Sequence, residues 1–144
     1  MKKKFVLGSR GWVEAFVNVL NSDPEYQSVA KDWEDPIVIL MTGLPPKLRE
    51  YFQSDAVGCW FDLYHGRCRS FELVKSIDEK PAPIVLYGMY ENMKKIAMGK
   101  VNPTIAVVTG QVKVKGNMAK LLSNAGASSA FVNALKKVST EFLA

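Results

Sequence analysis

The sequence has no long hydrophobic run, which argues against a membrane-spanning helix. Among its 144 residues the longest apolar run is the five residues 37–41, whereas a helix that crosses a bilayer needs about 20 apolar residues. The lysines at positions 2–4 precede an apolar stretch of only three residues, and a secretory signal needs about 7–15. We therefore expect a cytoplasmic protein, and the length predicts a single domain over residues 1–144.

Cysteine and histidine are scarce, with two cysteines and one histidine in the chain. Cys59 and Cys68 are nine positions apart, which is wider than the spacing within common metal sites, and His65 alone cannot complete a ligand set. We therefore expect no metal. An intracellular setting favours two free thiols over a disulfide, and we expect Cys59 to be the more buried of the two.

Motifs that support catalysis are also missing. The sequence has no G-x-G-x-x-G, no phosphate-binding loop and no nucleophile elbow. His65 falls in an expected turn, and neither cysteine has a histidine base in a clear geometry. Asp62 and Arg69 can pair across an expected hairpin, but an exposed ion pair of this kind contributes little. We predict that the protein is not an enzyme and uses no cofactor.

The formal net charge is +5, but the lysines are scattered along the chain. They occur in small groups at 2–4, 94–95, 113 and 115, and 136–137, as expected of solvated surfaces. No stripe interleaves basic and aromatic residues as a nucleic-acid-binding surface would, so we expect no nucleic acid partner. A basic field of this size can still attract an anionic membrane surface or an acyl carboxylate.

The patterns that are present predict an α+β fold. Alternating or continuous apolar segments predict strands near residues 36–42, 57–64, 68–75, 83–87 and 110–115. Helical periodicity follows Ser9, resumes from residue 25, and returns at 89–98, after Asn102, after Asn117 and from 127 to 142. Because strands and helices do not alternate regularly, we predict a mixed β-sheet of about five strands with helices mainly on one face.

The segment 57–75 predicts a β-hairpin whose register depends on its loop. A two-residue turn at 65–66 would place Phe61 opposite Ser70, whereas a three-residue loop would place Phe61 opposite Phe71. The second register makes one face uniformly apolar. Because burial of that face specifies the pairing, we expect the three-residue loop.

One segment resembles a known family. Gly99-Lys100-Val101-Asn102-Pro103, then Ala106, then the run 110–118 (GQVKVKGNM) resemble the C-terminal signature of the sterol carrier protein type 2 family. The resemblance implies a five-stranded sheet covered on one side by helices, with an apolar tunnel between the layers. Its members bind sterols, fatty acids, acyl-CoA thioesters and phospholipids, and most are not catalytic. Met93 stands where stand-alone relatives often have tryptophan, which leaves the shape of the pocket and the identity of the ligand open.

The candidate ligand-binding residues are apolar side chains expected to face this tunnel. Methionine is frequent, and its flexible side chain suits adaptable binding surfaces, although the same residues can simply fill a core. The expected lining comprises Phe61 and Phe71 from the sheet and Met89, Met93, Val108, Met118, Leu122 and Phe131 from helices.

The leading hypothesis is intracellular binding and transfer of a lipid or other hydrophobic small molecule. The alternative is a regulatory or assembly module with a vestigial pocket, in which Trp60 and Tyr64 on the outer sheet face form an interaction surface, for example in a homodimer. In the first hypothesis the last helix, with its stripe from Phe131 to Phe142, is expected to act as a lid that moves on the small-residue segment 124–128.

Overall fold

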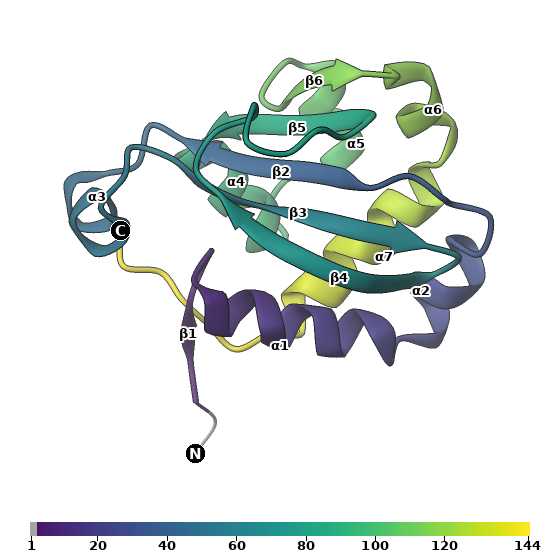
Figure 1. Ribbon diagram of the computed structural model, residues 1–144, viewed down its shortest axis with the longest axis horizontal. Coiled ribbons are helices and arrows are strands. Elements are labelled where there is room, and N and C mark those ends of the chain that lie inside the picture. The colour runs from purple at the N-terminus through teal and green to yellow at the C-terminus, as the bar shows by residue number, and fades with distance from the viewer. Residues whose placement is uncertain (1–2) are drawn as a thin grey trace.

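The computed structural model, which describes residues 3–144, is built around a five-stranded mixed sheet (Figure 1). Its spatial order is β4-β3-β2-β5-β6. The parallel pair is β2 with β5, and the other neighbours are antiparallel. The strands are β2 (Ile37–Thr42), β3 (Val57–Tyr64), β4 (Arg67–Val74), β5 (Ile84–Met89) and β6 (Lys113–Gly116). The α+β prediction is confirmed, and β6 is shorter than expected.

Helices cover one face of this sheet. In Figure 1, α4, α5 and α7 lie behind the sheet, α1 runs along its lower edge, and α3 lies at one end. Side-chain caps fix several helix starts, since Ser9, Asn102 and Asn117, after which the sequence predicted helices, each accept at least one backbone hydrogen bond. The helices are α1 (Arg10–Asn21), α2 (Pro24–Val29), α3 (Pro46–Phe52), α4 (Tyr90–Ala97), α5 (Pro103–Val108), α6 (Met118–Ser123) and α7 (Ala125–Lys136).

The β3–β4 hairpin has the predicted register but not the predicted loop. Phe61 pairs with Phe71, as expected. The loop, however, has only two residues, His65 and Gly66, with φ of 52° and 79°. Positive φ at both positions is typical of a tight type I′ turn, and a register shift between the pairs of Phe61 and Leu63 absorbs the extra residue as a bulge. The three-residue loop was therefore wrong, and the bulge replaces it.

The two chain ends form a second, small sheet that the sequence did not reveal. Strand β1 (Phe5–Val6) pairs in parallel with β7 (Thr140–Glu141), and the indole nitrogen of Trp12 donates a 2.9 Å hydrogen bond to Thr140 Oγ1. Helix α7 ends at Lys136. The predicted helical stripe through Phe142 is therefore wrong, because the chain leaves the helix to pair with β1.

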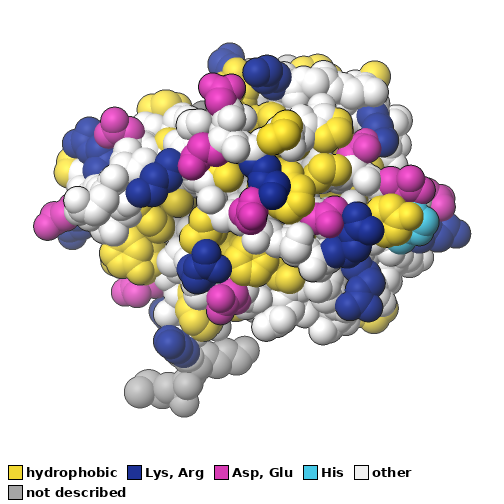
Figure 2. Space-filling view, viewed as in Figure 1, with side chains coloured by type: hydrophobic (Ala, Val, Ile, Leu, Met, Phe, Trp, Pro, Cys, Tyr) yellow, Lys and Arg dark blue, Asp and Glu magenta, His cyan; other side chains and the backbone are white. Residues whose placement is uncertain are grey.

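The main core lies between the sheet and the helices, where Phe16 and Leu20 are fully buried. A smaller apolar cluster occupies the outer sheet face, which Figure 2 shows with hydrophobic side chains among charged ones. The connection between β4 and β5 packs Ile77 and Ala82 against this cluster, and Lys80 Nζ lies 4.0 Å above the ring of Trp60. None of the helices in residues 3–144 is long and apolar enough to cross a membrane.

Candidate ligand cavity

A cavity of about 180 Å³ lies between the inner face of the sheet and the helices. Strand β3 contributes Val57, Cys59, Phe61 and Leu63, which all face inward because successive strand residues alternate between the two faces. Helix α1 contributes three of its buried residues, Trp12, Val13 and Phe16. None of the described residues that line the cavity is charged, so its interior favours an apolar guest.

Four of the eight predicted site residues meet at this cavity. Phe61 from β3, Met93 from α4, Leu122 from α6 and Phe131 from α7 all contribute to its lining. Phe71 is half-buried and packs against the core without lining the cavity. Contact of these residues with a ligand stays a prediction.

The structure does not bring the other three to the cavity, which corrects the predicted lining. Met89, Val108 and Met118 have exposed fractions of 54%, 71% and 42%. Met89 precedes the first residue of α4, and Met118 is the first residue of α6, so each lies at a helix start rather than on an inward face. On α5 the inward positions are Ala106 and Val107, which turn Val108 to the outside.

Sequence reasoning missed part of the aromatic wall. Trp12, Tyr26 and Trp33 line the cavity and are buried. Trp12 lies on α1 and Tyr26 on α2, whereas Trp33 follows the end of α2. Helical periodicity predicted their burial, but a buried aromatic stripe gives no sign of whether it faces a cavity or a filled core. Whether these residues face the cavity depends on how they pack against the sheet, and those contacts join segments that are distant in sequence.

Helix α7 belongs to the core, contrary to its expected role as a lid. The ring of Phe131 lies 4.8 Å from that of Phe16 and 5.7 Å from that of Phe61, both in edge-to-face geometry. Ala130 and Ala134 on the same helix are fully buried. The small-residue segment 124–128 mostly forms the first turn of α7, so it does not provide a free hinge.

The cavity is less covered beside α5, α6 and α7 than beside α1. Its lining residues from α1 are buried, whereas all of those from α5 and α6, and four of the five from α7, are only half-buried. Helix α6 has no fully buried residue, although Leu121 and Leu122 face the cavity. These two short helices therefore form the rim of its opening.

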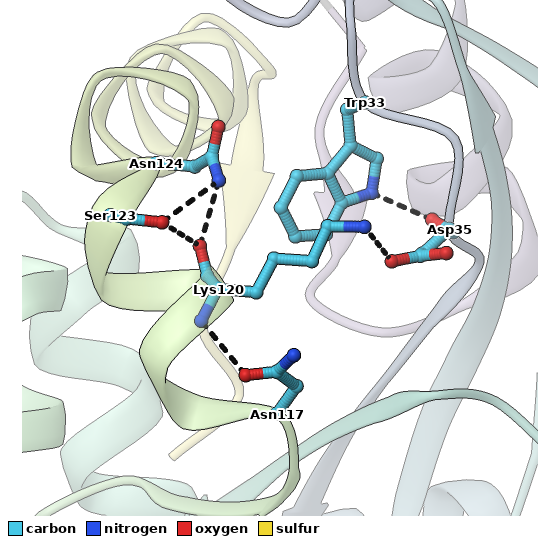
Figure 3. Close-up of polar contacts among 6 residues, drawn as sticks. All are labelled: Trp33, Asp35, Asn117, Lys120, Ser123 and Asn124. Atoms are coloured by element: carbon cyan, nitrogen blue, oxygen red, sulfur yellow. Dashed lines mark hydrogen bonds and ion pairs between the residues drawn. The ribbon is translucent and has the colours of Figure 1, made fainter.

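A polar cluster fastens α6 to the segment that precedes β2 (Figure 3). Lys120 Nζ forms an ion pair with the carboxylate of Asp35 and lies 5.0 Å above the ring of Trp33. The indole nitrogen of Trp33 in turn donates a 2.7 Å hydrogen bond to the Asp35 carbonyl. We call Trp33, Asp35 and Lys120 the α6 latch, since they join α6 to the segment that precedes β2.

Burial keeps the two cysteine thiols neutral. Burial raises the pKa of Cys59 to about 12 and that of Cys68 to about 11. Both thiols are free and almost completely buried, so their exposed fractions do not distinguish them, and the expectation that Cys59 is the more buried stays a prediction. Residues 3–144 bring together no group of three or more histidine, cysteine, aspartate or glutamate side chains that could hold a metal ion.

Comparison with known proteins gives a family match and several similar structures. Residues 16–128 match the model of the SCP-2 sterol transfer family. A search of curated proteins finds no match. The fold resembles the crystal structure of a sterol carrier protein 2, with a TM-score of 0.78 and 23% identity over 92% of this chain and 98% of that one.

Two solution structures extend this similarity. A conserved hypothetical protein from Thermus thermophilus gives a TM-score of 0.80 and 22% identity, over 97% of this chain and 94% of that one. The sterol carrier protein 2 of Aedes aegypti, solved in complex with the C16 fatty acid palmitate, gives a TM-score of 0.53 and 18% identity, over 92% of this chain and all of that one. At these identities the similarity establishes a shared fold.

Proposed function

Because the chain belongs to the SCP-2 sterol transfer family, we propose that it binds a lipid or another hydrophobic small molecule in its cavity and transfers it. The observation that carries this proposal is the apolar, uncharged cavity, whose lining comes largely from the residues that match the family. The Aedes aegypti protein of similar fold was solved with palmitate, which supports an acyl chain as one class of ligand.

The physical chemistry of the cavity favours loose selection of a ligand. A sixteen-carbon chain buried at about 0.8 kcal/mol per methylene gains roughly 12 kcal/mol before the costs of ordering it. Those costs leave an affinity near the micromolar range. Since the lining contains no charged group to pair with a carboxylate or phosphate, a charged head group stays at the opening.

The ligand must also widen the cavity. Its volume of about 180 Å³ is close to that of an engineered cavity of about 150 Å³ that holds benzene, and is below the roughly 300–1,000 Å³ of typical ligand pockets. A long acyl chain therefore needs a wall to move. Helix α6 is the best candidate because it has no fully buried residue and is held by a half-exposed ion pair.

We propose no catalytic residue and no cofactor, so the protein acts by binding. Three hydroxyl side chains line the cavity: Thr104 and Ser128 are half-buried, and Tyr26 is buried. Burial raises the pKa of Tyr26 and keeps the thiol of Cys59 protonated. The alternative of an assembly module is not favoured, because Trp60 on the outer face is half-buried beneath Lys80. Location in the cytoplasm and formation of a homodimer stay predictions.

The direct test is native mass spectrometry of protein purified without detergent, followed by titration with a fluorescent fatty acid. We expect a co-purifying lipid and saturable binding of one ligand per chain. Ala127 lines the cavity and Ala125 does not, although both lie in the first turn of α7. The variant Ala127→Phe should therefore weaken binding at least about ten-fold, and Ala125→Phe should not. Consistently empty protein that binds no fatty acid would refute the proposal in favour of the assembly module.

A further inference from the structure

We infer that the exposed side of α5, with the end of α4, is a docking surface for an anionic lipid bilayer. The surface comprises Lys95, Met98, Lys100, Ile105 and Val108, and we call it the α5 surface. Docking does not depend on what the cavity holds. Exchange of ligand with the docked bilayer, however, rests on the proposed function.

The first observation is an uneven distribution of charge. Residues 92–140 contain eight lysines and no arginine, aspartate or glutamate. This stretch therefore carries +8, which leaves −3 for the remainder of a chain whose net charge is +5. It builds most of α4 and all of α5, β6, α6 and α7, so the elements around the opening of the cavity carry the positive charge.

Most of these lysines are not neutralised by neighbouring acids. Within residues 3–144, Lys120 and Lys137 are the members of this group that pair with an aspartate or glutamate. Lys95 and Lys100 are exposed and form no such pair among the described residues. They are therefore available to an external anion.

The second observation is a set of exposed aliphatic side chains in the same segment as these lysines, at the end of α4 and on α5. Ile105 and Val108 are 57% and 71% exposed, and their spacing of three places them on the same side of α5. Met98, at the end of α4, is 42% exposed. A single exposed apolar residue is ordinary on a protein surface, whereas two of the six residues of one short helix are exposed here.

The other side of α5 faces the ligand cavity. Pro103, Thr104 and Val107 line it, so α5 is a wall one helix thick between the cavity and the outside. In Figure 1 this helix lies behind the sheet, on the helix-covered side of the molecule. A bilayer seated on the α5 surface would therefore lie beside the half-buried rim formed by α5 and α6.

The chemistry of the surface fits a bilayer better than a nucleic acid or a protein. Aliphatic side chains partition into the boundary between head groups and acyl chains, and lysines are attracted to anionic head groups. Single-stranded nucleic acid would call for aromatic or arginine side chains to stack on bases, and protein interfaces are rich in the same residues. Residues 92–140 contain no arginine, and their one aromatic residue, Phe131, is buried.

The test is co-sedimentation of the full chain with vesicles of phosphatidylcholine alone or with about 30% phosphatidylserine, at about 0.1 M salt where surface attraction is still felt. We expect binding to the anionic vesicles that weakens as salt is raised. At about five-fold per lysine, Lys95→Glu/Lys100→Glu should weaken partitioning at least about 25-fold. Ile105→Asp/Val108→Asp should also weaken it strongly, although this variant changes the net charge only half as much.

The matched control substitutions lie outside residues 92–140. Lys31→Glu/Lys47→Glu reverses two exposed lysines with the same change in net charge, and Val29→Asp replaces a valine that is 45% exposed on α2. Both should leave vesicle binding nearly unchanged. Thermal unfolding of every variant verifies the fold, and fatty-acid titration without vesicles should give wild-type affinity for the α5-surface variants.

Two results would overturn the inference. One is an equal loss of vesicle binding in the control variants and the α5-surface variants, since that would mean that net charge alone determines binding. The other is absence of preference for anionic vesicles, including the case in which the same surface binds single-stranded DNA instead. If neither the wild type nor any variant binds fatty acid, that result counts against the proposed function. The docking inference is then decided by the vesicle measurements alone.

Discussion

At the scale of single residues, we expect the α6 latch to affect the rate of ligand release more than the free energy of unfolding. The ion pair of Lys120 and Asp35 is partly exposed, and pairs of this kind contribute about 0–1 kcal/mol to the free energy of unfolding. Its position matters more than its strength, because it bridges α6 to the segment before β2. Breaking the pair should therefore free the rim of the cavity while the core stays intact.

We predict that Asp35→Asn changes the free energy of unfolding by less than about 1 kcal/mol and increases the dissociation rate of a bound fluorescent fatty acid several-fold. Stopped-flow displacement measures the rate. Asp62→Asn is the control, since it breaks the 3.1 Å pair with Arg69 on the outside of the hairpin. A wild-type dissociation rate in Asp35→Asn would show that α6 does not control release.

A second prediction concerns the buried thiols and alkaline pH. Burial raises the pKa of Cys59 from 9.0 to about 12, so the unfolded chain ionises first as pH rises. The stabilisation from keeping this thiol neutral is therefore fully present below about pH 9 and is lost as pH approaches 12. Each such thiol contributes a loss of at most about 1.4 kcal/mol per pH unit in that range.

We predict that Cys59→Val unfolds with a weaker dependence on pH than the wild type between about pH 9 and 11. Urea unfolding at a series of pH values measures it, and the two proteins should give parallel curves below about pH 8. Cys68 and Tyr26, whose pKa values burial also raises, should maintain part of the alkaline loss in both proteins. Identical slopes in the alkaline range would show that the cavity wall admits water to Cys59.

At the scale of elements, α7 was expected to act as a lid but belongs to the core, and α6 is the less buried of the two helices. Phe131 on α7 is 8% exposed and contacts three aromatic rings, whereas Leu122 on α6 is half-buried. We predict that Phe131→Ala destabilises the fold by about 3–5 kcal/mol and Leu122→Ala by about 1 kcal/mol or less. Equilibrium denaturation compares the two.

Deletion from Gly126 onward gives a sharper form of the same comparison. It removes Phe131 together with the fully buried Ala130 and Ala134, so the truncated chain should not fold. A folded, cooperative truncation product would restore α7 as a lid. Amide hydrogen exchange should meanwhile be faster in α6 than in α7, because α6 has no fully buried residue.

Local signals predicted most elements, and contacts between distant segments explain the failures. Asparagine caps and alternating strands located α5, α6 and β3 because their chemistry acts within a few residues. The hairpin register followed from burial, although the bulge that achieves it left no signal. The pairing of β1 with β7 joins the two ends of the chain, and neither two-residue strand carries a pattern of its own.

At the scale of the whole molecule, the sequence predicted an apolar layer but not which of its residues meet empty space. Phe61 and Phe131 were predicted and line the cavity, whereas Val108 has the same apolar character and faces outward. The difference is one residue of helix rotation on α5, about 100°, and hydrophobicity does not fix that angle in a helix of six residues. The same rotation creates the exposed aliphatic patch of the α5 surface.

The last prediction concerns ligand length, because the cavity at its present volume is too small for a long chain. A volume of about 180 Å³ holds roughly six to eight carbons, judged from the cavity of about 150 Å³ that holds benzene. Up to that length each methylene should strengthen binding about four-fold, the equivalent of about 0.8 kcal/mol. Beyond it each methylene must also displace α6, so the gain per carbon should fall.

A series of saturated acyl ligands from four to sixteen carbons, each below its micellar concentration, tests this by competition with a fluorescent fatty acid. The wild type should show a break in slope near eight carbons and continued, smaller gains to sixteen. Asp35→Asn should restore the steeper slope at longer lengths, because the latch no longer holds α6 against the ligand. A flat plateau beyond eight carbons in both proteins would mean that the cavity does not open along α6, and that its natural ligand is no longer than the space already present.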